Sequence, residues 1–377
     1  MKNIYLAVDL GSTTIDTCLL SVTGEIICQK SFKNRQSLYG SDVINRIMTA
    51  VRDSSYVKIM KNIVLTDICV AVTEMLDMHR EYAFDNILRV CISGNTTMIS
   101  ILLEYDLESL GKAPFTAKLK ESVIVSANEL FKEIDSVSFN QGCRVYLTGC
   151  ASAFIGGDIL AGIKYLRTNG MMTDTDVSLL MDLGTNGEMV LNAYGKYYAT
   201  SCACGPAFES ALRKQKVFGA NLIDAISLAV KTKKISDEGI LCSEYFEKGL
   251  DIMDVHLDMD IIRQVLPAKA AVITAVTYLF KHAYIPCEQV DTVYLAGGFG
   301  FYLSPSNAIS IGMLPLAFEN KIKVVGNTSL KGAITLLCDS DYAGCIIDRS
   351  IEVLQLANEP DYQDVLINNM NFKSKEI

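Results

Sequence analysis

The chain has 377 residues, of which 50% are hydrophobic, and it carries a formal net charge of −9. Domains usually have roughly 100–200 residues, so this length predicts two or three folding units, each able to bury its own core. The acidic balance argues against a nucleic-acid partner, because phosphate backbones are bound by clustered lysine and arginine. No secretory signal opens the chain and no apolar run reaches the ~18 residues of a membrane span, so we expect a cytoplasmic protein with no membrane partner.

The cysteine pattern argues against two kinds of metal site. The chain has 12 cysteines and 3 histidines, and it contains no Cys-x-x-Cys pair. A zinc ribbon or a ferredoxin-type cluster needs closely spaced cysteines, so we expect neither in this chain. Most of the cysteines lie in apolar segments, where a thiol typically packs as a small hydrophobic side chain.

The first half of the chain opens with a predicted hairpin. Residues 5–20 contain a run of branched apolar residues, the polar turn Asp9-Leu-Gly-Ser-Thr-Thr14 and a second apolar run. Buried strands are apolar on both faces and a glycine-containing turn can reverse the chain, so this pattern predicts two strands. Apolar spacing then predicts further elements. They are a strand at 26–32, helices at 41–51 and 57–78, a strand at 87–93, a helix ending at 103, a strand at 144–148 and a tightly packed helix of small residues ending at 165.

The second half repeats this hairpin. Residues 178–191 contain Asp182-Leu-Gly-Thr-Asn-Gly-Glu188 between two apolar runs, nearly half the chain after the first Asp-Leu-Gly triplet. Two equivalent hairpins predict two similar α/β domains that face each other across a cleft. The other predicted elements are a strand at 197–202, a helix opened by 205–209, a long helix at 261–283, a strand at 292–295 and terminal helices at 341–371.

The repeat also predicts the domain boundaries. We expect the first domain at residues 1–170 and the second at residues 171–340. The C-terminal helices, at about 341–377, could cross back to the first domain. Proline is sparse and no Ser/Gly-rich or charge-rich linker occurs, so the domains should be packed together or interleaved.

The two hairpin turns contain the residue types of a magnesium and phosphate site. An aspartate at the end of a buried strand can hold a hydrated Mg²⁺, while backbone N–H groups of the turn bind phosphate oxygens. Asp9 and Asp182 are the candidate metal ligands. Either turn alone could instead be an ordinary hairpin turn, in which Asp and Gly are favoured anyway. The candidate phosphate-binding residues are Gly11, Ser12, Thr13 and Thr14 in the first turn and Gly184, Thr185, Asn186 and Gly187 in the second.

A third glycine-rich turn, Gly297-Gly298-Phe299-Gly300, lies between the strand at 292–295 and the helix predicted after it. This order is typical of nucleotide sites, because backbone amides approach phosphate closely only where no Cβ intervenes. The chain has no GxxxxGK[ST] loop, and this turn lacks the third glycine and the acidic follower of a dinucleotide fingerprint.

Together, Asp9–Thr14, Asp182–Glu188 and Leu295–Gly300 resemble the two phosphate loops and the adenosine loop of the actin-like (ASKHA) ATPases. That superfamily has duplicated, ribonuclease H-like α/β domains around a nucleotide cleft. Further motifs narrow the resemblance to the DUF4445-type ATPase domain of the reductive activators of corrinoid proteins, from about residue 3 to about residue 345. These motifs are Gly40–Ile44, Ser93–Met98, Ala113–Phe115, Thr200–Glu209 and Ile311–Pro315.

The resemblance implies an ATPase that binds ATP with Mg²⁺, places the adenosine end at residues 297–300 and couples hydrolysis to domain closure. Such activators use ATP to return a corrinoid cobalt from Co(II) to Co(I). Their electrons arrive through an iron–sulfur domain at one end of the chain, and this sequence shows no such domain. We therefore expect a corrinoid protein and a separate iron–sulfur electron donor as partners.

Three acidic residues are weaker candidates. Asp158 could position the water that attacks the γ-phosphate, as an acidic residue does in related ATPases, or it could be a carboxylate on a helix surface. Glu188 and Glu209 are candidate contacts to nucleotide or Mg²⁺ by their motif positions. Asn95 and the two threonines after it could cap a helix, or they could reach substrate or phosphate.

One departure from the family involves cysteine. The family typically shows Ser-Cys-Ala-Ala-Gly-Pro, whereas this chain has Cys202 and Cys204 in Ser-Cys-Ala-Cys-Gly-Pro. The activators of 2-hydroxyacyl-CoA dehydratases, which share the superfamily, bridge one cluster between two subunits with two cysteines from each. In one interpretation, Cys202 and Cys204 hold such a cluster in a homodimer. In the other, the two thiols pack a tight turn before a helix.

Three other functions fit the same scaffold. The chain could be a small-molecule kinase, which would transfer phosphate to an acceptor in stoichiometric amounts. It could be an activator of the 2-hydroxyacyl-CoA dehydratase type. It could also be a non-redox assembly or regulatory ATPase that uses closure to hold or release another protein.

Overall fold

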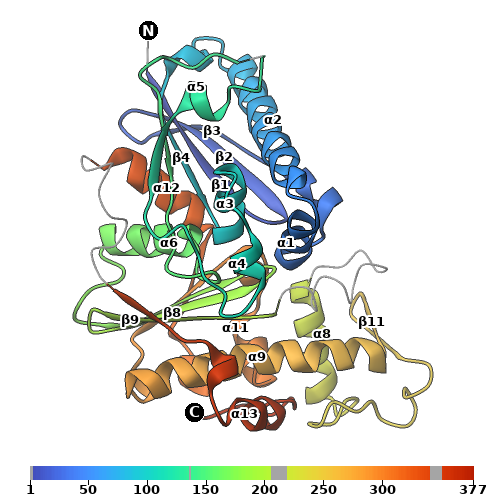
Figure 1. The fold of residues 1–377 in the computed structure, drawn as a ribbon. Helices are drawn as coiled ribbons and strands as arrows, with labels where there is room; N and C mark the ends of the chain where they lie inside the picture. Colours follow the sequence, from blue (N-terminus) through green and yellow to red (C-terminus); the bar gives the residue numbers. More distant parts are fainter. Residues whose placement is uncertain (1–2, 136, 205–218, 340–349) are drawn as a thin grey trace. The chain divides into compact units, whose positions relative to one another are not determined.

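The computed structural model describes residues 3–135, 137–204, 219–339 and 350–377. These residues form two compact units, each built on a six-stranded sheet. The first unit contains the chain up to Met171 and the helix α12 (Thr328–Cys338). The second contains Met172–Asn327 and the C-terminal segment that begins with β14 (Ile351–Val353). Figure 1 shows both units, with labels on many of their helices and strands.

The first sheet has the strand order β3-β2-β1-β4-β6-β5. Strands β1, β2 and β3 form an antiparallel meander, and β1 also pairs in parallel with β4, which pairs in parallel with β6. The predicted first hairpin is therefore β1 and β2. The strands are β1 (Ile4–Leu10), β2 (Thr14–Ser21), β3 (Ile26–Lys33), β4 (Ile87–Gly94), β5 (Val123–Ser126) and β6 (Arg144–Leu147).

Helices cover both faces of this sheet, so its central strands are apolar on both sides. On one face, α2 packs against β2 and β3, and on the other α6 and α12 pack against β4 and against each other (Figure 1). A Cβ on Gly332 of α12 would lie only 2.1 Å from the Ala161 carbonyl oxygen of α6, so the close packing of these two helices requires glycine. The helices are α1 (Val43–Arg52), α2 (Ser55–Met78), α3 (Thr96–Leu102), α4 (Glu108–Gly111), α5 (Ala127–Leu130) and α6 (Gly157–Thr168), with 3₁₀ turns η1 (Arg35–Tyr39) and η2 (Phe84–Asn86).

The second sheet repeats this arrangement, with the order β13-β12-β7-β8-β9-β14. Here β7, β8 and β9 form the antiparallel meander, and β7 pairs in parallel with β12, which pairs in parallel with β13. The duplicated α/β fold predicted from the two Asp-Leu-Gly hairpins is thus confirmed. The strands are β7 (Val177–Leu183), β8 (Gly187–Ala193), β9 (Lys196–Cys202), β12 (Thr292–Ala296) and β13 (Ile322–Gly326), with a separate hairpin of β10 (Leu250–Ile252) and β11 (Val255–Leu257).

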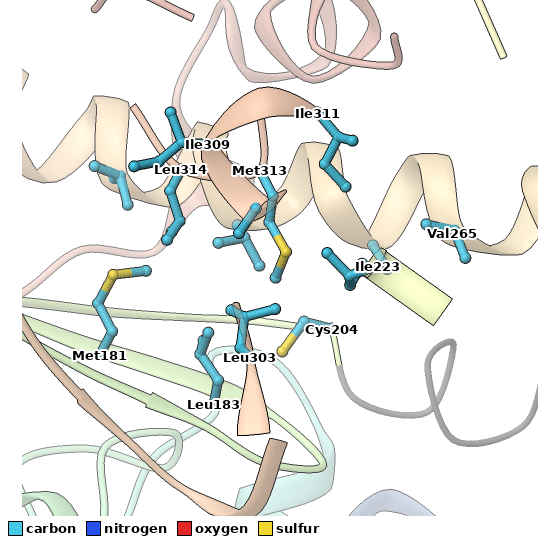
Figure 2. Close-up of a cluster of buried hydrophobic side chains, with 14 of the residues drawn as sticks. Met181, Leu183, Cys204, Ile223, Val265, Leu303, Ile309, Ile311, Met313 and Leu314 are labelled. Atoms are coloured by element: carbon cyan, nitrogen blue, oxygen red, sulfur yellow. The ribbon is translucent and has the colours of Figure 1, made fainter. Parts of the chain in front are cut away.

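The hydrophobic core of the second unit lies between the sheet and its helices. Figure 2 shows part of it, where Met181 and Leu183 of β7 belong to the same cluster as Leu303, Met313 and Leu314. The long helix α9 packs across β8 and β9, and α10 packs against β7 and β12. The helices are α8 (Gly219–Lys231), α9 (Met259–Ala283), α10 (Gly298–Tyr302), α11 (Pro305–Ser310) and α13 (Tyr362–Asn368), with 3₁₀ turns η3 (Cys287–Gln289), η4 (Leu316–Phe318) and η5 (Leu356–Asn358).

The C-terminal part of the chain differs from the sequence expectation. The segment expected to return to the first domain instead adds β14 in parallel to β9 and places α13 on α9, both in the second unit. The helix that belongs to the first unit is α12, although the sequence repeat predicts that residues 171–340 form the second domain. Its apolar and small residues complement α6, β1 and β4, and apolar spacing alone does not indicate which of two similar sheets a helix will cover.

No helix among the described residues is long and apolar enough to cross a membrane.

Candidate functional site

The first hairpin places Asp9 near the end of β1, on the sheet face that α12 covers. The Asp9 carboxylate is half-buried and accepts a 2.7 Å hydrogen bond from the Ser329 hydroxyl, at the start of α12. The same hydroxyl lies 3.0 Å from the Ser93 hydroxyl of β4, which donates to the Gly157 carbonyl of α6 over 3.2 Å. These bonds connect β1, β4, α6 and α12 directly around the candidate metal ligand.

The loop after β1 is held from inside the unit. Its Gly11 and Thr13 carbonyls accept hydrogen bonds of 2.9 Å from the Asn34 side chain and backbone N–H, respectively. The Ser12 carbonyl accepts a 2.6 Å bond from the Arg46 guanidinium. The donors of Asn34 and Arg46 are buried, so these bonds hold the three carbonyls toward the interior of the unit.

Gly11 is required by the turn itself. A Cβ at this position would lie 2.5 Å from the Thr14 carbonyl oxygen, which no side chain tolerates without a shift of the backbone. The side chains of Thr13 and Thr14 are exposed.

The second hairpin places Asp182 at the corresponding position of β7. Asp182 pairs with Glu188 across the hairpin and with Ala296 of the parallel neighbour β12. Gly297, which follows β12, has φ +82°, and a Cβ there would lie 2.5 Å from an Asp182 carboxylate oxygen. The structure therefore brings the predicted second metal ligand and the predicted adenosine loop together, and it does so only because residue 297 is glycine.

The rest of the third glycine-rich turn becomes the start of α10. Gly298 is exposed, and a Cβ on it would meet nothing within 4 Å. Gly300 lies close to Leu295 and Leu183, where a Cβ would be in tight contact with Leu295. Phe299 is half-buried and packs against the core cluster.

The second hairpin loop, and the start of β8 that follows it, lie close to both candidate cluster cysteines. Within it, the Gly184 N–H donates to the Asn186 carbonyl over 2.9 Å, and the side chains of Thr185 and Asn186 are half-exposed. A Cβ on Gly187 would lie 3.0 Å from the Cys202 sulfur and 2.9 Å from the Cys204 sulfur.

The two cysteines have different environments. Cys204 is buried within the apolar cluster that Figure 2 shows, as expected of a thiol that packs as a small hydrophobic side chain. Cys202 is half-exposed and pairs with Gly187 across the hairpin of β8 and β9. Within the described ranges, no group of three or more His, Cys, Asp or Glu side chains is arranged to hold a metal ion.

Asp158 lies in the first turn of α6, where its carboxylate accepts a 2.9 Å hydrogen bond from the Ile159 N–H. A Cβ on Gly156 would lie within 3 Å of the Asp158 carboxylate and of the backbone of Asn95 and Thr96, so these groups meet around a glycine. Burial raises the pKa of the Asp158 carboxyl to about 6, because a low-dielectric environment disfavours the charged form.

Asn95 has the capping role that the sequence left open. Its side chain accepts a 3.0 Å hydrogen bond from the Met98 N–H at the start of α3. The Thr96 hydroxyl donates to the Ser152 carbonyl over 2.7 Å. Glu209 lies outside the described residues.

The oxygen donors at both hairpins suit Mg²⁺, which proteins usually bind through one or two carboxylates together with water and phosphate oxygens. Asp9 and Asp182 are both half-buried, and the space that Gly297 leaves is occupied by the Asp182 carboxylate. The assignment of both residues as metal ligands stays a prediction.

Sequence reasoning missed several polar residues around these loops. Asp16 lies opposite Asp9 in the first hairpin, just as Glu188 lies opposite Asp182 in the second. An alignment of the two sequence repeats would have identified Asp16. Ser329 is 320 residues from Asp9 along the chain, so no local pattern could connect them. Arg46 follows the Gly40–Ile44 motif, but the sequence alone does not show that it reaches Ser12.

Comparisons with known proteins identify the family. Residues 4–170 match the model of the "RACo middle region", and residues 176–231 and 215–377 match the "C-terminal domain of RACo the ASKHA domain". A solved "Reductive activator for corrinoid,iron-sulfur protein" superposes with a TM-score of 0.82 at 26% identity, covering 99% of this chain and 66% of that chain.

Two curated relatives match over most of this chain. The "Corrinoid activation enzyme RamQ" of Eubacterium limosum is 26% identical, covering 98% of this chain and 71% of the relative. The "[Co(II) methylated amine-specific corrinoid protein] reductase" of Methanosarcina barkeri is 20% identical, covering 91% of this chain and 71% of the relative. The chain thus spans about two thirds of the lengths of these proteins, and it belongs to the RACo family, with the RACo middle region in its first half and the RACo ASKHA domain in its second.

Proposed function

We propose that this chain is an ATP-dependent reductive activator of a corrinoid protein, in which ATP binding and hydrolysis drive the reduction of cobalt from Co(II) to Co(I). The observation that carries the proposal is the match over 99% of this chain, with a TM-score of 0.82, to a reductive activator for a corrinoid, iron–sulfur protein. Both curated relatives are also named for corrinoid activation or reduction.

The two hairpins supply the nucleotide-binding groups in this proposal. Asp9 and Asp182 hold Mg²⁺, and the backbone N–H groups of the loops at 11–14 and 184–187 bind phosphate oxygens. Mg·ATP supplies the free energy for a reduction that would otherwise be unfavourable. Asp158 accepts a proton from the attacking water, for which a pKa of about 6 suits a base that is ionised at neutral pH.

The electron comes from a separate iron–sulfur protein. The cysteine spacing of this chain does not suit a ferredoxin-type cluster, and Cys204 is occupied in the apolar core of the second unit. Iron analysis of anaerobically purified protein tests this assignment. Stoichiometric iron that is lost on substitution of Cys202 would place a cluster in this chain instead.

The test of the whole function is anaerobic. The protein is mixed with a Co(II) corrinoid protein, a low-potential reductant and Mg·ATP, and the Co(I) absorbance is followed. We expect Co(I) to form with ATP and not with ADP, while phosphate is released as free orthophosphate. The absence of any ATP-dependent Co(I) signal would overturn the proposal, and transfer of the phosphate to a small acceptor would indicate a kinase.

A further inference from the structure

A buried polar network lies directly beneath the loop that follows β1. Asn34, Gln36 and Arg46 are each at most 1% exposed. The Asn34 side-chain amide donates to the Gly11 carbonyl over 2.9 Å and also lies 3.3 Å from the Gln36 side-chain oxygen. The Gln36 amide nitrogen donates to the Met60 carbonyl over 3.1 Å. Polar groups of this kind are costly to bury unless they are hydrogen-bonded, so the network is built for a definite arrangement of the loop.

Arg46 is the charged member of this network. Its guanidinium donates to the Ser12 carbonyl over 2.6 Å, to the Gly40 carbonyl over 3.0 Å and to the Gln36 side-chain oxygen over 3.3 Å. All of these acceptors are neutral. Among the described residues, no carboxylate lies within ion-pairing distance of Arg46; the Asp42 side chain, whose charge acts on it more weakly, caps α1 by accepting from the Asn45 N–H.

The charge on Arg46 is retained at neutral pH although its environment opposes it. Burial lowers the pKa of the guanidinium to about 10, which still leaves it protonated near pH 7. A buried charge without a counter-charge is expensive, and arginines in such positions are usually paired. Three neutral oxygens and the Met98 sulfur, 3.4 Å away, accept hydrogen bonds from the guanidinium, and none of them compensates its positive charge.

The position of the Arg46 guanidinium, beneath the loop after β1, indicates which kind of ligand would compensate its charge. The buried Arg46 guanidinium binds the Ser12 carbonyl, in the loop whose backbone N–H groups were predicted to bind phosphate. By holding the Ser12 carbonyl inward, Arg46 also keeps the negative end of that peptide dipole away from an anion on the loop. Both effects, the fixed carbonyl and the buried positive charge, favour a polyanion over a neutral ligand.

We propose that Arg46 is a positioning residue for the polyphosphate of the nucleotide: it fixes the phosphate loop through Ser12 and supplies the buried positive charge that the phosphates neutralise. This inference rests on the proposed ATP-binding function. It assigns a role to Arg46, which lies outside the predicted phosphate loops and donates to the Gly40 carbonyl of the Gly40–Ile44 motif.

The test measures how affinity changes with the number of phosphates. Dissociation constants for adenosine, AMP, ADP and ATP, with Mg²⁺, are determined by calorimetry for the wild type, Arg46→Lys and Arg46→Met. We expect Arg46→Met to weaken ATP binding by about tenfold or more, to weaken ADP less, and to leave adenosine within about twofold. Arg46→Lys, which keeps the charge and loses the planar fork, should lie between Arg46→Met and the wild type.

Arg89→Met is the matched control. Arg89 also donates to a backbone carbonyl of the first unit, that of Leu337, and its guanidinium lies over the Tyr5 ring. A purely structural role for Arg46 would weaken adenosine and ATP equally and leave their affinity ratio at the wild-type value, and that result would overturn the inference. If Arg46→Met does not fold, as judged by thermal unfolding, Arg46→Lys decides: an unchanged ratio of ATP to adenosine affinity rejects the proposal. A wild type that fails to bind ATP would instead reject the proposed function.

Discussion

The Ser329 hydroxyl donates a 2.7 Å hydrogen bond to the Asp9 carboxylate, although 320 residues separate them in the chain. Ser329 thereby fixes the orientation of the residue predicted to hold Mg²⁺. Removing this hydroxyl with Ser329→Ala should lower ATP turnover by about tenfold, because hydrogen bonds to charged groups contribute roughly 1.5–3 kcal/mol. Steady-state phosphate release measures the effect.

Thr335→Ala is the control for Ser329→Ala. Thr335 lies on the same helix, and its hydroxyl donates to the Lys331 carbonyl one turn earlier in that helix. We expect wild-type turnover from this variant. Equal turnover of the two variants would show that Asp9 does not depend on Ser329.

Asp9→Asn and Asp182→Asn should each lower ATP turnover by about a hundredfold or more, since the amide keeps the shape of the side chain but removes the charge that holds a metal ion. Both variants should also need more Mg²⁺ to reach half their maximal rate. Turnover is measured against Mg²⁺ concentration, with Asp77→Asn on the exposed face of α2 as the control. A variant with wild-type turnover and Mg²⁺ dependence would remove that aspartate from the metal site.

Gly297→Ala and Gly298→Ala should have opposite consequences although they are adjacent. At Gly297 the added Cβ meets the Asp182 carboxylate and the Leu183 carbonyl, and the φ of +82° is unfavourable for alanine. We expect a loss of about 1–3 kcal/mol in the free energy of unfolding and weaker ATP binding. At Gly298 the Cβ meets nothing within 4 Å, and alanine in place of glycine at an unstrained position stabilises a protein by about 0.4–1 kcal/mol.

Thermal unfolding and ATP titration of the two glycine variants provide the measurement. If Gly297→Ala is as stable as Gly298→Ala and binds ATP equally well, the close approach of Gly297 to Asp182 does not matter for the fold or the nucleotide.

The raised pKa of Asp158 should affect stability and activity in opposite directions as the pH changes. Burial raises the pKa of its carboxyl to about 6, above its value in the unfolded chain. In the folded state this group therefore binds its proton more tightly, and its contribution to stability is present at low pH and lost as the pH rises through about 6. A general base must be ionised, so ATP turnover should instead fall as the pH is lowered through about 6.

Asp158→Asn separates these two effects. At pH 8 it should be at least as stable as the wild type, because it no longer buries a charge, yet its turnover should be strongly reduced. Its pH profile should also lack the acidic limb. An unchanged profile in Asp158→Asn would assign that limb to another group and leave Asp158 as a structural residue of α6.

Apolar spacing predicted helices and strands correctly where one element is long enough to show its own periodic pattern. The helix predicted at 57–78 is α2 (Ser55–Met78), and the strand predicted at 87–93 is β4 (Ile87–Gly94). By contrast, the C-terminal region predicted as helices contains the strand β14, because three residues at the edge of a sheet leave almost no periodic signal.

The sequence by itself determined the duplicated hairpins, since aspartate, glycine and apolar runs at matching spacing describe the same turn wherever they occur. The tertiary structure decided which groups surround those turns. Ser329 reaches Asp9, Arg46 reaches Ser12, and Gly297 admits Asp182, all through contacts between residues far apart in the chain. Such contacts depend on how helices and strands pack, and packing is set by the shapes of both surfaces and not by the spacing of residues in either one. Length, composition and charge argued against a nucleic-acid-binding protein and a membrane protein. Only the packed structure showed which polar side chains support the candidate nucleotide loops.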